Sequence, residues 1–155
     1  MLRPALFAFI CLFLSFSVAQ AQEEAPQPNL DALKVGDPLT PEDGVYWNLR
    51  GEEGMLNLRF VGTRLRLYFV DGAGELIEPP YPIALVRYEN AVRTGGNRQL
   101  TKLTLAGDGL YLASPRVIPQ PLRYRVWVLL KTKESDGEEK DTQSYPQRIL
   151  SGLGQ

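Results

Sequence analysis

The sequence predicts an all-β protein, an antiparallel Ig-like β-sandwich of about seven or eight strands, with a small β-barrel as the alternative. Three observations predict this class. Apolar and polar residues alternate with a period of two in segments between residues 44 and 131. Turn residues interrupt the alternation at short intervals. No stretch of eleven or more residues keeps the 3.6-residue apolar period of an amphipathic helix, so strands must supply the core.

Each expected strand is short and contains β-branched or aromatic residues. Turns separate them, including a four-residue loop from Gly51 to Gly54 and the Asp108-Gly109 pair, which is typical of a hairpin. Residues 144–155 contain enough apolar side chains for one further edge segment. The seven main strands are expected at residues 44–50, 55–60, 64–70, 81–90, 99–106, 109–114 and 123–131.

The first 21 residues have the pattern of a secretory signal peptide. Arg3 precedes an apolar run from Ala5 to Val18, and Ala19 and Ala21 form an A-x-A cleavage site. This run of 14 residues is too short to span a bilayer core of about 30 Å as a helix. We therefore expect cleavage after Ala21, no membrane span in the mature chain, and a periplasmic or secreted protein.

The composition of the mature chain restricts its chemistry. Cys11, the only cysteine, lies in the expected signal peptide, and the sequence contains no histidine. A Ser-His-Asp triad, a Cys-His pair, a zinc site and a histidine-based copper site are therefore excluded. Without disulfides, the domain must be stabilised by its core. We expect no enzymatic activity, no cofactor and no metal site.

Charge divides the mature chain into three parts. Residues 22–43 form an acidic, proline-containing lead-in with six acidic residues and one lysine. Residues 44–133, the expected β-domain, contain thirteen basic and seven acidic residues, and residues 134–155, an acidic loop with a terminal edge segment, contain five acidic and two basic ones. The basic centre is either balanced within the molecule by its acidic flanks or available to an acidic partner. Export and the overall acidity argue against nucleic acid as that partner.

Alternation places arginines on the outer face of three expected strands, two of which also carry an outward aromatic residue. The inward sets are Leu56, Leu58 and Phe60; Leu65, Leu67 and Phe69; and Tyr124, Val126, Val128 and Leu130. If these strands are neighbours, the outer residues form one basic and aromatic face. Either arginine–aromatic stacking simply covers the sheet, or the face binds an acidic glycan, a phospholipid headgroup or an acidic protein segment. The candidate ligand-binding residues are Arg59, Arg64, Arg66, Tyr68, Arg123, Arg125 and Trp127.

Three segments carry a resemblance to known proteins: LYFVDGAGELIEPP at residues 67–80, QLTKLTLAGDGLYLAS at 99–114 and RYRVWVLLK at 123–131. Together they resemble small exported bacterial β-sandwich proteins of unassigned function, and in outline they are similar to periplasmic Ig-like domains of heavy-metal efflux systems. The resemblance covers about residues 64–131. It implies an envelope protein with a sandwich fold, and it assigns a role to no residue.

From these observations we expect an exported, non-enzymatic binding or accessory module of the bacterial cell envelope. Its Arg/aromatic sheet face would be directed toward an acidic partner such as an envelope protein or an acidic glycan. An alternative is an accessory domain of an envelope metal-efflux or transport system. A third interpretation is a small hydrolase that uses two carboxylates, for which Glu78 and Glu89 are the nominal pair.

Overall fold

A computed structural model describes residues 30, 32–39, 43–51, 53–92, 97–107, 109–119, 123–134 and 137–151 of the chain. Within these residues all regular structure is β-strand, and no helix is present. The strands are β1 (Val45–Asn48), β2 (Met55–Val61), β3 (Arg64–Val70), β4 (Leu76–Ile77), β5 (Ile83–Asn90), β6 (Gln99–Ala106), β7 (Tyr111–Ala113), β8 (Arg123–Lys133) and β9 (Glu139–Ser151).

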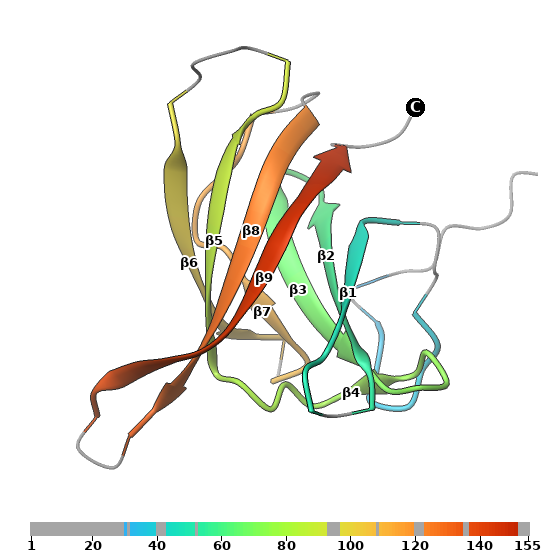
Figure 1. The fold of residues 1–155 in the computed structure, drawn as a ribbon. Helices are drawn as coiled ribbons and strands as arrows, with labels where there is room; N and C mark the ends of the chain where they lie inside the picture. The colour runs from blue at the N-terminus through green and yellow to red at the C-terminus, as the bar shows by residue number, and fades with distance from the viewer. Residues whose placement is uncertain are drawn as a thin grey trace, which may run out of the picture.

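The nine strands form one antiparallel sheet in the order β1-β2-β3-β7-β6-β5-β8-β9, with β4 paired to β3. The sheet curls until its two end strands, β1 and β9, lie side by side (Figure 1). Side chains connect these strands: the Trp47 indole N–H donates to the Pro146 carbonyl over 2.8 Å, and the Gln143 amide donates to the Arg50 carbonyl over 3.0 Å. The result is a nearly closed barrel, so the barrel alternative describes this protein and two packed sheets do not.

The barrel interior holds the main hydrophobic core, and the predicted inward residues of β2, β3 and β8 are all part of it. Period-two alternation produces this result, because successive side chains of a strand point to opposite faces of the sheet. Leu103 and Leu112 reach the same core from β6 and β7 and are also fully buried. The strand alternation in the sequence therefore identified the inward residues of these three strands correctly.

A second, smaller core lies outside the barrel, over β3 and β4. It contains five buried residues, Leu39, Tyr68, Val70, Leu76 and Leu110. The acidic lead-in covers this outer face, and its backbone is bonded to β4: the Gly36 N–H donates to the Leu76 carbonyl, and the Leu76 N–H donates to the Asp37 carbonyl. The described part of the lead-in is therefore built into the fold.

The C-terminal segment forms a longer strand than the short edge segment that the sequence predicted, because β9 begins at Glu139. β8 and β9 form the longest hairpin of the sheet, and its far end projects beyond the other strands (Figure 1). The ladder between them shifts register between Val126 and Val128, so Pro146 and Gln147 both lie opposite Trp127. This irregularity is a β-bulge, which bends a strand locally and changes the direction of the neighbouring side chains.

Candidate functional site

The seven predicted site residues fall into two separate groups, because β8 is not a neighbour of β2 or β3 in the sheet. The condition for a single face, that all three strands are neighbours, is therefore not met. In the first group, on β2 and β3, Arg64 is exposed and Arg66 is half-buried, with its guanidinium 4.5 Å from the centre of the Tyr111 ring. Arg59 and Tyr68, expected at the surface, have relative exposures of only 1% and 0%.

Arg59 and Tyr68 are buried because other segments cover the outer face of their strands. The Arg59 Nε donates to the Asn57 side-chain oxygen over 2.6 Å, and its Nη1 lies 3.8 Å from a carboxylate oxygen of Asp43. Burial raises the pKa of Tyr68 above its ordinary value, although the hydrogen bond from Arg66 partly opposes this effect. These two covered side chains do not belong to an accessible binding surface.

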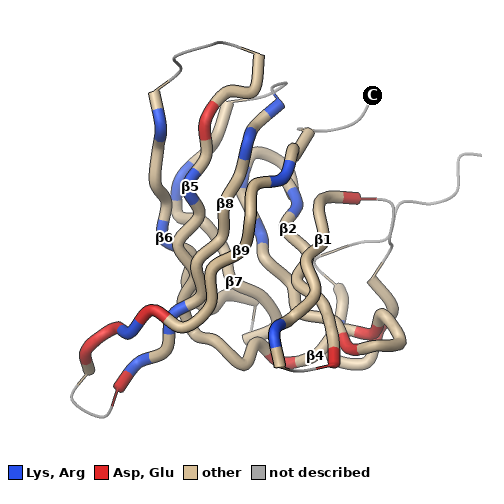
Figure 2. The backbone as a smooth tube through the Cα atoms, in the orientation of Figure 1, with Lys and Arg blue, Asp and Glu red and all other residues tan. Residues whose placement is uncertain are grey.

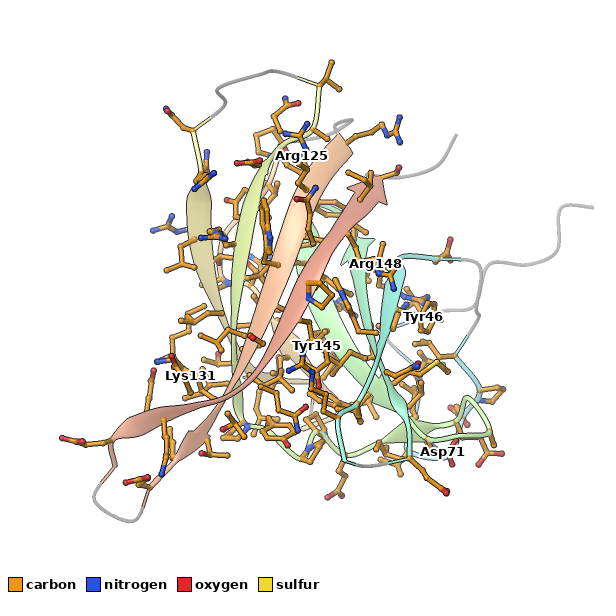
Figure 3. The ribbon with its side chains drawn as sticks, viewed as in Figure 1. Tyr46, Asp71, Arg125, Lys131, Tyr145 and Arg148 are labelled. Atoms are coloured by element: carbon orange, nitrogen blue, oxygen red, sulfur yellow. The ribbon has the colours of Figure 1, made fainter. Side chains whose placement is uncertain are left out.

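The second group lies on β8. Arg123 is exposed at the first position of the strand, and Arg125 is half-buried and pairs with Glu89 on β5 over 3.2 Å. Figure 3 shows Arg125 near the upper end of β8. Trp127 is half-buried, and the guanidinium of Arg87 lies 4.7 Å from the centre of its ring. Arg87 is directly opposite Trp127 in the β5–β8 ladder, so the cross-strand register brings the two together.

A surface groove of about 490 Å³ begins at this Arg87–Trp127 pair. Four strands and the loop after β1 line it, and we call it the Arg87–Trp127 groove. Its lining residues are Arg50, Leu85, Arg87, Leu100, Trp127, Val128, Leu129, Ser144, Tyr145 and Pro146. The volume is in the range of known small-molecule sites. Of these residues, only Trp127 was among the candidates from the sequence.

The charges on the groove are both positive. Arg50 and Arg87 are exposed, and the groove lining contains no aspartate or glutamate. Within the described parts of the chain, neither arginine forms an ion pair. Arg50 lies 5.9 Å from the centre of the Tyr145 ring, so both guanidinium groups rest beside aromatic rings. Figure 2 shows basic segments along β5, β8 and β9, and acidic ones at the hairpin end and near β4.

Glu89 lies two residues beyond Arg87 on β5, and arginines engage both of its carboxylate oxygens. Arg98 and Arg125 contact its two carboxylate oxygens at 3.1 and 3.2 Å. Desolvation raises the pKa of Glu89, but these two hydrogen bonds and the charges of both arginines outweigh it and lower the pKa below its ordinary value. A carboxylate held ionised in this way is a poor general acid.

The nominal carboxylate pair is not assembled into one site. Glu78 lines a different hollow of about 800 Å³, between the lead-in and the β6–β7 turn, whereas Glu89 is at the end of β5. Neighbours of that hollow's lining, residues 31 and 108, lie outside the described residues. Among the described residues, no three His, Cys, Asp or Glu side chains gather in a way that could hold a metal ion.

The fold and the groove define an all-β protein with a basic and aromatic surface site. No protein-family model matches the chain, and comparison with curated proteins and with solved structures finds no match. In the part of the chain that the structure describes, no helix is long and apolar enough to cross a membrane.

Proposed function

We propose that this chain is a non-enzymatic binding module of the bacterial cell envelope, and that it binds an acidic partner through the Arg87–Trp127 groove. The location rests on the signal peptide expected at residues 1–21. The binding role rests on the groove itself. The sequence also suggested an efflux accessory domain and a carboxylate hydrolase. No specific observation on the described residues favours either of these alternatives.

One observation carries this proposal: Arg50 and Arg87 are exposed beside an apolar groove and have no carboxylate partner among the described residues. Elsewhere on the same face, Arg98 and Arg125 share Glu89, and Lys131 contacts both Glu139 and Asp141. The groove therefore keeps an uncompensated positive charge next to Trp127. An anionic group placed there would gain both the attraction of the charges and the burial of apolar surface.

The test is retention on immobilised polygalacturonate and lipopolysaccharide at low and high salt. The Arg50→Gln/Arg87→Gln variant should bind about tenfold more weakly, because it loses two charge-assisted contacts of roughly 0.7 kcal/mol each. The control, Arg64→Gln/Arg116→Gln, removes the same charge from two exposed arginines outside the groove and should bind like wild type. Equal loss in both variants, or no retention of the wild-type protein at low salt, would contradict the proposal.

A further inference from the structure

The polar groups of the groove are too few for a ligand rich in hydroxyl groups. Besides Arg50 and Arg87, the lining residues whose side chains carry polar atoms are Ser144, Trp127 and Tyr145. The Tyr145 hydroxyl is already bonded to the Gln143 side chain. A sugar residue placed here would lose water from several hydroxyl groups and find few replacements, which is unfavourable for each unsatisfied group.

The apolar lining of the groove is elongated and runs across the strands. Leu100 on β6, Leu85 on β5, Leu129 on β8 and Pro146 on β9 all line it. The ladders place these positions in two adjacent cross-strand rows: Leu85 is opposite Leu129, and two residues along β5, Arg87 is opposite both Leu100 and Trp127. Neighbouring strands are 4.7–4.9 Å apart, so three spacings make an apolar track of about 14 Å. A chain-shaped ligand fits this track better than a compact one.

The two arginines that have no ion pair in the described part of the chain lie along the track. Arg87 is in the same cross-strand row as Leu100 and Trp127, and Arg50 is at the side of β9, over Tyr145. Figure 3 shows Tyr145 where β9 approaches β1. An anionic headgroup can therefore reach a guanidinium while its chain stays on the apolar track. The combination selects for a negative charge and for a long apolar chain at the same time.

We infer that the groove binds a single-chain anionic amphiphile, a long-chain carboxylate or its phosphate or sulfate counterpart, as a monomer. This inference rests on the proposed function, because it names the chemical class of the acidic partner at the same site. The headgroup pairs with Arg50 or Arg87, and the alkyl chain covers Leu85, Leu100 and Leu129.

The test is calorimetric titration of the full chain with dodecanoate below its critical micelle concentration. We expect one site, and about tenfold weaker binding for octanoate, because a chain shorter by four methylenes buries less apolar surface in the half-open groove. Dodecyltrimethylammonium, which has the same chain and a cationic head, should not bind. Arg50→Gln/Arg87→Gln should weaken dodecanoate binding about tenfold, while Arg64→Gln/Arg116→Gln should not.

A second pair of variants tests the apolar track. Leu100 and Leu105 are both on β6 and have similar relative exposures of 53% and 49%, but only Leu100 lines the groove. Leu100→Ser should weaken dodecanoate binding several-fold, and Leu105→Ser should leave it unchanged. Equal effects of the two substitutions, or equal binding of the cationic amphiphile, would show non-specific adsorption and overturn the inference.

Two further outcomes separate this inference from the proposed function. If trigalacturonate binds through Arg50 and Arg87 and dodecanoate does not, the inference is wrong and the proposed function stands. If the protein binds only vesicles that contain phosphatidylglycerol, and no monomeric amphiphile, the site recognises a lipid surface and the inference is again wrong. If no anionic probe binds at all, both fail.

Discussion

Single residues of the same type have very different environments in this protein. Arg59 is enclosed under the segment around Asp43, where Asn57 and the Tyr46 hydroxyl contact its guanidinium. Arg87, in contrast, is exposed and rests on one face of Trp127. The guanidinium of Arg59 holds buried polar groups together, whereas the charge of Arg87 is accessible to a ligand. Function should therefore depend on Arg87, and stability on Arg59.

The first prediction at the residue scale concerns this difference. Arg59→Ala should lower the free energy of unfolding by about 2–4 kcal/mol, because it removes a buried side chain and leaves the Asn57 side-chain oxygen without its donor. The control is Arg64→Ala on the next strand, where the side chain is exposed and the cost should be within about 0.5 kcal/mol. Urea unfolding monitored by circular dichroism measures both. Similar small losses in the two variants would contradict the buried role of Arg59.

At the scale of the strands, the sequence predicted which residues face the core but could not predict how the strands are arranged. Period two is a property of each strand alone, so the inward residues of β2, β3 and β8 were identified correctly. The pairing of Arg87 with Trp127 depends on a register between residues forty positions apart. This register is determined by the arrangement of all the strands in the sheet, so a local sequence pattern cannot predict it.

The same limit explains why Arg59 and Tyr68 were placed at the surface. Alternation shows which face of a strand a residue occupies, but not whether a distant segment covers that face. Here the lead-in adds backbone hydrogen bonds to β4 and supplies Leu39 to the outer core. Its prolines and low apolar content gave no periodic signal, since an extended segment that lies over a sheet face without forming a strand needs none.

The entry into β1 provides the prediction at this scale. Gly44 has a φ of 87°, and a Cβ there would lie 2.5 Å from the Leu58 carbonyl oxygen and 2.8 Å from the Arg59 Cβ. Gly44→Ala should therefore cost clearly more than the roughly 1–2 kcal/mol of left-handed strain alone. Gly62, in the β2–β3 turn, has a φ of 58° and no atom within 4 Å of the same position. Gly62→Ala is the control, and thermal unfolding of the two variants should separate strain from steric overlap.

At the scale of the whole molecule, the charges are distributed over the surface in a way that leaves one face basic. Ion pairs between β6, β8 and β9 neutralise much of the acidic C-terminal hairpin, as in the contacts of Glu139 with Lys102 and Lys131. The hydrogen bond from Lys102 and the charges of both lysines hold the pKa of Glu139 below its ordinary value, although desolvation opposes them. With these hairpin acids engaged, no carboxylate among the described residues pairs with Arg50 or Arg87.

The last prediction concerns export, on which the proposed location depends. The protein recovered from the cell envelope should begin at Gln22, because the apolar run from Ala5 to Val18 followed by the Ala19-to-Ala21 site has the pattern that a signal peptidase cleaves. Mass spectrometry of the N-terminal peptide measures this directly. Cleavage also removes Cys11, the only thiol, so the melting temperature should be identical with and without a reductant. An intact Met1 in the mature protein, or a melting temperature that falls when the reductant is added, would contradict export through this signal and would remove the basis for an envelope partner.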